Sequence, residues 1–381
     1  MAIDRFSFPT DIRFGLGARH LLADHLLEVG VGRPLVVTDK GVSALPLLDE
    51  LVGALRGAGL QPAVFDGVWG NPTESQVRSG VGRYHEHGAD AVVGVGGGAA
   101  LDVAKAVALM ATHPGELFDY EDGRPGARPI TDAVCHLVAL PTTAGTGSEV
   151  GRSAVISDDT THVKRIIFSP HLLARVVLAD PELTVGLPPQ LTAATGMDAL
   201  THNIEAYLAK AYHPICDGIA LEGLRLGATH LLRAVAEPGD LDARTGMLMS
   251  SMMGAIAFQK GLGVVHSTAH ALGTVADLHH GLANAVMIDH ALRINVEACP
   301  ERFAMLAASA GLDSHAPDAF LGWLRDLKTD IGIPPSLSQL GVDPSRIDEL
   351  SRVAFADPCH LDNPRPVTEA DLRGIFVEAF G

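Results

Sequence analysis

Cysteine is rare in this chain of 381 residues, which contains only Cys135, Cys216, Cys299 and Cys359. These residues lie far apart and form no CxxC pair. Their spacing excludes a disulfide framework and a zinc site built from thiolates. Scattered single cysteines are typical of proteins in a reducing compartment, so we expect a cytoplasmic location.

Positive charge and long apolar runs are also scarce. The chain has 28 basic and 45 acidic residues, a net charge of −17, and only six lysines. The absence of a basic block argues against a nucleic acid or an anionic membrane as partner. The apolar run from Val92 to Leu101 covers only about half of a membrane span. Asp4 and Arg5 stand where a secretion signal needs apolar residues, so we expect no such signal.

Apolar residues are plentiful, at 47% of the chain, and the length suggests two domains. In the first half, short apolar runs alternate with helical stretches. Near-continuous apolar strands separated by helices predict a parallel sheet covered on both faces. Residues 154–157 and 163–168 predict a hairpin added to that sheet. The other expected strands are 34–39, 62–65, 91–95, 136–140 and 176–178.

The second half has helical periodicity throughout, beginning after Pro188 and Pro189. Gly, Pro and Asp separate the expected helices. We therefore predict an α/β domain over residues 1–185 and an all-helical domain over residues 186–381. The expected helices are 191–209, 215–234, 244–259 and 284–297.

A glycine-rich turn, Gly94–Ala100, follows an expected strand and opens a helix that contains Asp102 and Lys105. Glycines let the backbone approach a phosphate, and the free N–H groups of a helix start favour an anion. The turn only loosely matches the dinucleotide fingerprint, and it lies about 90 residues into the chain. A tight strand-to-helix turn without a ligand is the alternative.

Two further features point to the same edge of the sheet. Asp39 ends an expected strand, where it could bind an adenosine ribose and repel a 2′-phosphate, which favours NAD over NADP. Its alternative role is to cap the helix after Gly41. The polar loop Pro141–Glu149 contains Thr142, Thr143 and Thr146, which suit phosphates or sugars, or it simply leads into the hairpin.

Histidines and one aspartate provide the strongest signal for chemistry. Asp198 and His202 are four residues apart on an expected helix, so their side chains share one face, and His266 and His270 have the same spacing. Three more histidines follow within 25 residues. This density favours a metal site over isolated structural histidines.

Geometry limits how these residues can meet. In one continuous helix His266 and His280 would lie about 21 Å apart. A break at Gly273 or within 277–281 would let Asp198, His202, His266 and His280 surround a divalent metal such as Fe(II), Zn, Mn or Co. His270 is then left over, as a candidate proton relay or as support for the ligands.

Four segments carry a resemblance to a known family: Gly96–Lys105, Pro141–Val150, Gly196–Tyr207 and His280–Ala285. They resemble the iron-containing (group III) alcohol dehydrogenases. The resemblance extends over nearly the whole chain, to Asn363-Pro364-Arg365.

This resemblance implies a Rossmann-like N-terminal nucleotide-binding domain and an all-helical C-terminal metal-binding domain, an architecture like that of dehydroquinate synthase. It implies Asp198, His202, His266 and His280 as metal ligands and His270 as an additional active-site histidine. Ala99 departs from the serine of many members, and Gln259-Lys260 from an Asn-Ala pair. The implied cofactor positions are Asp39, Asn71, Gly97, Gly98, Ala99, Asp102, Thr142, Thr143, Thr146, Ser153 and Lys164.

The implied activity is hydride transfer between NAD and a small primary alcohol or hydroxy acid, with Fe²⁺ as the metal and Zn²⁺ as the alternative. We expect a homodimer or larger homo-oligomer. A zinc enzyme resembling glycerol dehydrogenase or dehydroquinate synthase is the rival within this architecture, and a non-catalytic metal or nucleotide sensor is the rival outside it. If Arg152 and Lys260 both face the cleft, the substrate would be an anionic aldehyde; the alternative is that they lie at the surface or on the cofactor.

Overall fold

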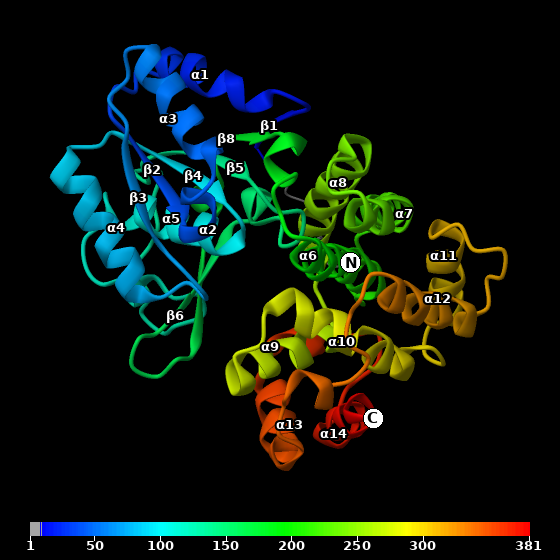
Figure 1. Cartoon of the computed structure of the whole chain (residues 1–381). Coiled ribbons are helices and arrows are strands. Elements are labelled where there is room, and N and C mark those ends of the chain that lie inside the picture. Colours follow the sequence, from blue (N-terminus) through cyan, green and yellow to red (C-terminus); the bar gives the residue numbers. More distant parts are fainter. Residues whose placement is uncertain (1–7, 9) are drawn as a thin grey trace. The chain divides into compact units, whose positions relative to one another are not determined.

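The computed structural model describes residue 8 and residues 10–381, so Asp4 and Arg5 lie outside the described residues. The chain forms two compact units. The α/β unit comprises Phe8–Thr143 and Ser148–Thr184, and the helical unit comprises Ala144–Gly147 and Val185–Gly381. Figure 1 shows the strands and helices of each unit. The predicted fold class, a parallel α/β part followed by a helical part, is confirmed.

A six-stranded parallel sheet forms the centre of the α/β unit, in the order β1-β8-β5-β4-β2-β3. All five predicted parallel strands are present, with small shifts at their ends. The edge strand β1 was not predicted, because its four residues include two charged side chains and give no apolar run. The strands are β1 (Asp11–Phe14), β2 (Pro34–Asp39), β3 (Ala63–Val68), β4 (Ala91–Gly96), β5 (His136–Pro141) and β8 (Val176–Ala179).

Helices cover both faces of this sheet, which explains why its strands are apolar throughout. On one face, α1 (Leu22–Glu28) and α3 (Pro46–Gly57) pack in one cluster with alternate strand residues such as Val93 and Val95. On the other face lie α4 (Glu74–His87) and α5 (Gly98–Met110). Gly94 admits α5, because a Cβ there would lie 2.9 Å from the Cβ of Ala104. The short helix α2 (Lys40–Ser43) follows β2.

The predicted hairpin forms, but its predicted attachment to the main sheet is wrong. Strands β6 (Ser153–Ser157) and β7 (Lys164–Phe168) form a separate two-stranded antiparallel sheet. The Val155 N–H of β6 donates to the Asp102 carboxylate at 3.0 Å. The Asp102 side chain of α5 therefore takes the Val155 N–H, which a neighbouring strand of the main sheet would need for its own hydrogen bond.

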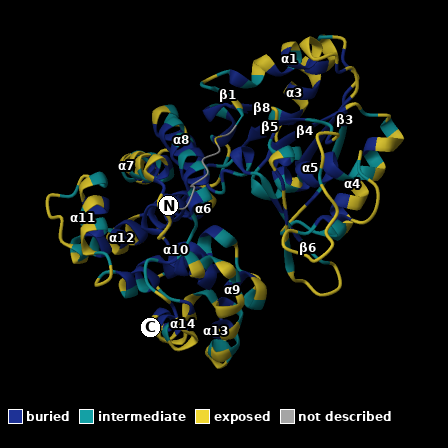
Figure 2. Ribbon diagram, turned by 180° about the vertical axis from the view of Figure 1, so that it is seen from behind, coloured by how far each residue is buried: buried dark blue, intermediate teal, exposed yellow. Residues whose placement is uncertain are grey.

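The helical unit is built around α6, which is buried at every residue from Thr192 to Leu208 and dark blue in Figure 2. Close packing needs small residues: a Cβ on Gly223 of α7 would lie 2.0 Å from Asn203 Oδ1 of α6. The predicted helices are confirmed, although the one expected at 284–297 spans His280–Leu292. The helices are α6 (Pro189–Leu208), α7 (Pro214–Ala236), α8 (Leu241–Ala257), α9 (Val264–Ala276), α10 (His280–Leu292), α11 (Pro300–Ser309), α12 (Pro317–Asp330), α13 (Ile347–Ala356) and α14 (Glu369–Phe380).

Among the described residues, no single helix has the length and apolar character needed to cross a membrane. One bent pair of segments, Leu241–Lys260 with Val264–Ala276, meets those criteria by length and composition.

A buried ion pair joins α12 to α10. Lys328 Nζ lies 2.5 Å from Asp289 Oδ1 and donates to the Val286 carbonyl at 3.0 Å. Both side chains are almost fully buried, with exposed fractions of 6% and 3%. Removing one partner leaves a buried charge without its counter-charge, which is strongly destabilising.

We expect Lys328→Met to lower the free energy of unfolding by about 3–5 kcal/mol, measured by urea denaturation. The control is Arg373→Met, since Arg373 and Asp348 form a pair with exposed fractions of 58% and 78%. That exposed pair contributes at most about 1 kcal/mol. Equal losses in the two variants would contradict this assignment.

Candidate active site

Three helices of the helical unit bring one carboxylate and three imidazoles together. Asp198 and His202 lie one turn apart on α6, His266 lies on α9, and His280 is the first residue of α10. The chain reverses between α9 and α10 because Asp277 adopts a left-handed conformation with φ of 50°. The predicted break is therefore present at 277–279, whereas Gly273 lies inside α9.

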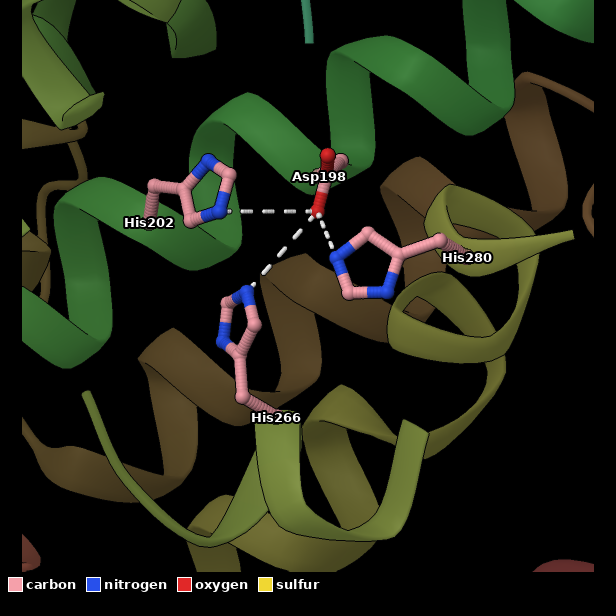
Figure 3. Close-up of side chains that lie close together, drawn as sticks. All are labelled: Asp198, His202, His266 and His280. Carbon is pink, nitrogen blue, oxygen red and sulfur yellow. Dashed lines mark ion pairs between the residues drawn. The ribbon is translucent and has the colours of Figure 1, made fainter. Parts of the chain in front are cut away.

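The four side chains point toward one another (Figure 3), and their nearest ligand atoms all lie within 4.8 Å. Asp198 Oδ1 is 3.8 Å from His202 Nε2, 3.9 Å from His266 Nε2 and 3.4 Å from His280 Nε2. Three of the side chains are buried, while His280 is 26% exposed. The cluster thus has one side with access to solvent within its unit.

Electrostatics make this cluster suited to a cation. Burial alone would raise the pKa of Asp198, but the facing histidines outweigh it and hold that pKa below its usual range. Burial also lowers the pKa of His266 well below its usual value, and His202 and His280 lower it further. A carboxylate and neutral imidazoles without thiolate are the donors that Fe(II), Zn, Mn or Co accept.

Asn284 lies within the same cluster, although it is not among the predicted site residues. Its Nδ2 is 2.7 Å from Asp198 Oδ1, 3.2 Å from His280 Nε2 and 3.4 Å from His266 Nε2. It lies one turn after His280 on α10, a spacing that could have marked it. Its amide hydrogen bond to Asp198 restrains the orientation of the carboxylate.

His270 lies beside the cluster, one turn after His266. Its ring stacks on that of His280 with centroids 5.3 Å apart. Its Nδ1 lies 2.7 Å from Asp357 Oδ2, and Ser267 donates to the other oxygen of Asp357 at 2.9 Å. Burial raises the pKa of Asp357, but the hydrogen bonds from His270, the Cys359 N–H and Ser267 outweigh it, and the net shift is downward. Asp357 is far away in sequence, and no motif marked it.

In the α/β unit, Asp39 and the glycine turn lie at the carboxyl end of the sheet. This is the place where the order in which successive strands are added changes direction. Strands β3 and β4 lie on opposite sides of β2, so the carboxyl ends of β2 and β4 flank a switch point, where open α/β sheets bind ligands. Asp39 ends β2, and its Oδ1 accepts from the Val42 N–H at 2.9 Å, so the helix-capping role is present. Its Oδ2 faces Gly96, where a Cβ would lie 2.8 Å away.

The glycine turn and the threonine loop meet at the ends of adjacent strands. Gly96 has φ of +152°, which requires glycine, and its carbonyl accepts from the Thr142 N–H at 3.0 Å. A Cβ on Gly97 would lie 3.0 Å from Thr143 Cγ2. Gly97 is the N-cap of α5 and Gly98 its first residue, so free N–H groups lie at this edge.

Other predicted cofactor positions are less concentrated. Asp102 uses both carboxylate oxygens within the protein, accepting from Ser148 Oγ at 2.6 Å and from Val155 N. The buried Lys105 donates to Ser148 Oγ at 2.7 Å and to the Ser153 carbonyl at 2.8 Å. The remaining positions are Ala99 in the first turn of α5, Asn71 between β3 and α4, Ser153 and Lys164 at opposite ends of the hairpin, and Thr146 in the 144–147 segment of the helical unit.

Lys260 stabilises the interior of the helical unit through its side-chain contacts. Its side chain is fully buried, forms an ion pair with Asp217 and donates to the Tyr207 carbonyl at 2.8 Å. Arg302 contacts the same two groups. Arg152 stacks over the Phe168 ring, with its guanidinium carbon 5.5 Å from the centroid. The ammonium group of Lys260 is therefore engaged within the protein core, which removes it from the anionic-substrate hypothesis.

Comparisons with known proteins agree with these features. The family described as iron-containing alcohol dehydrogenase matches residues 9–181, and its C-terminal family matches residues 192–380. The 4-hydroxybutyrate dehydrogenase of Cupriavidus necator is 44% identical over 98% of both chains. The NAD-dependent methanol dehydrogenase of Bacillus methanolicus is 36% identical over 98% of this chain and 99% of its own. A crystal structure of 1,3-propanediol oxidoreductase matches with a TM-score of 0.94 and 38% identity, covering 99% of this chain and 100% of that one.

The sheet edge, the carboxylate–imidazole cluster and these matches define a dehydrogenase. The chain belongs to the iron-containing alcohol dehydrogenase family. Its activity is that of an NAD-dependent alcohol dehydrogenase.

We expect Lys260→Met to destabilise the protein by about 1–3 kcal/mol, because the bonds to Asp217 and to the Tyr207 carbonyl, each worth about 0.5–1.5 kcal/mol, are lost while Arg302 keeps its contacts with both groups. Chemical denaturation measures this loss. The ratio of kcat/KM values for carboxylated and neutral substrates should stay at the wild-type value. A selective loss on the carboxylated substrate would contradict the structural role.

Proposed function

We propose that this enzyme oxidises small primary alcohols, diols or hydroxy acids with NAD, using Fe(II) held by Asp198, His202, His266 and His280. The convergence of three imidazoles on one buried carboxylate oxygen carries this proposal. Iron is the metal of the family name, and Zn(II) is the alternative that the same donors accept. The cytoplasmic location and the homo-oligomer remain predictions.

The residues have separate roles in this chemistry. A divalent cation bound here would lower the pKa of an alcohol hydroxyl. His270 donates its Nδ1–H to Asp357, which leaves Nε2 as the acceptor for the substrate proton. In the α/β unit, Asp39 would bind the adenosine ribose, and the N–H groups at Gly97 and Gly98 would bind the pyrophosphate. Thr142 and Thr143 border the same edge.

A hydroxy acid is the substrate that we would test first, because the 44% identical relative is a 4-hydroxybutyrate dehydrogenase. A 1,3-diol comes next, since the matching crystal structure is of a 1,3-propanediol oxidoreductase. Both compounds present a primary alcohol at the end of a short chain.

We expect His266→Ala to lose bound metal and to lower turnover by more than about 100-fold, because a ligand supported by a carboxylate disappears. Metal analysis and steady-state kinetics measure the two effects. His315→Ala, a change at an exposed histidine, should alter neither. Lost metal with turnover near wild type would refute the metal-dependent mechanism.

Removing the metal with a chelator should abolish NADH formation, and anaerobic Fe(II) should restore it. The assay compares 4-hydroxybutyrate, 1,3-propanediol, 1-propanol and glycerol, with Zn(II) reconstitution in parallel. Restoration only by Zn(II), or turnover only of glycerol, would favour the rival polyol oxidoreductase over the proposed enzyme.

A further inference from the structure

One buried carboxylate contacts the cluster without being among its four converging residues. Glu205 lies on α6, seven residues after Asp198, so two turns of one helix separate them. Its side chain is only 2% exposed. It accepts hydrogen bonds from the Val265 N–H at 2.7 Å and the His266 N–H at 3.2 Å, and its Oε2 lies 2.6 Å from His266 Nδ1.

The bond to Nδ1 determines which ring nitrogen of His266 is free to face the cluster. An ionised Glu205 can only accept, so His266 then carries its proton on Nδ1 and has a lone pair on Nε2. That Nε2 lies 3.9 Å from Asp198 Oδ1, on the side where the other imidazoles converge. The two backbone bonds hold the start of α9 to the same carboxylate, which limits rotation of the ring.

The backbone at the start of α9 leaves room for the Glu205 carboxylate. Gly263 is the N-cap of α9 and has no side chain with which to cap the helix. A Cβ at Gly263 would lie 2.7 Å from Glu205 Oε1, so any larger residue would displace the carboxylate. Glu205 thus binds the second and third N–H groups of a 13-residue helix from outside it, where the helix dipole favours an anion.

We propose that Glu205 is a positioning residue that presents His266 Nε2 to the metal by fixing the tautomer and the orientation of the ring. This inference rests on the proposed metal centre. Metal-bound histidines commonly donate their other N–H to a carboxylate, which makes the ligand nitrogen more basic. Since α6 carries Asp198, His202 and Glu205, one helix supplies two ligands and orients a third.

The test is Glu205→Gln, which keeps the size of the side chain but replaces one acceptor oxygen with an NH₂ donor. We expect its Zn(II) affinity to fall about 10–100-fold, measured by competition with a chromophoric chelator on folded protein. Glu149→Gln is the matched control, because Glu149 is also a buried carboxylate but lies in the α/β unit. Its Zn(II) affinity should match wild type.

A second measurement needs no variant. In metal-free wild-type protein labelled with ¹⁵N-histidine, His266 should show a protonated Nδ1 and an unprotonated Nε2, with the signals assigned by comparison with His266→Ala. The opposite tautomer would overturn the inference, even if Glu205→Gln failed to fold. A purely structural role predicts a lower melting temperature of the metal-free variant with Zn(II) affinity unchanged.

The outcomes separate this inference from the proposed function. Metal retained by His266→Ala would refute the proposed centre itself. Metal lost by His266→Ala, together with Zn(II) affinity within about twofold of wild type in Glu205→Gln, would refute only the role of Glu205.

Discussion

The burial of Asp198 among three imidazoles is the constraint on which the helical unit depends. An ionised carboxylate is costly to bury unless cations or hydrogen-bond donors surround it. Here Asn284 donates to it, and His202, His266 and His280 face it. Protonated imidazoles so close together would repel one another, whereas neutral ones direct lone pairs to a common point. The arrangement therefore suits the binding of one divalent cation better than the binding of a proton to each imidazole.

The fold meets this constraint through close helix packing. Helix α6 has no exposed face between Thr192 and Leu208, so its polar side chains in this span are directed into the interior of the protein. Gly281 lets the start of α10 approach α6, because a Cβ there would lie 2.4 Å from the Ala194 carbonyl oxygen. The turn at Asp277 then places His280 opposite His266, although they are 14 residues apart in the chain.

The sequence predicted the secondary structure well where periodicity was strong. The buried strand β4 stands out because all its residues are apolar or glycine, and the long helix α6 stands out by its helical periodicity. The attachment of the hairpin and the contacts of Lys260 were harder to predict. Whether β6 joins the main sheet depends on the hydrogen bond that its Val155 N–H donates to Asp102 of α5, and no local pattern records that bond. Lys260 lies next to a motif, yet its ammonium group pairs with Asp217 on another helix.

The sequence by itself determined the fold class, the family, and the identity of the converging residues Asp198, His202, His266 and His280. Motif spacing carries that information, since residues four apart share a helix face and glycines mark tight turns. The tertiary structure alone identified the groups that hold these residues: Glu205 on His266, Asp357 on His270, and Asn284 on Asp198. Hydrogen bonds between distant segments depend on how helices pack. The periodicity of a helix shows which face is buried, but it does not show which residue of another helix that face meets.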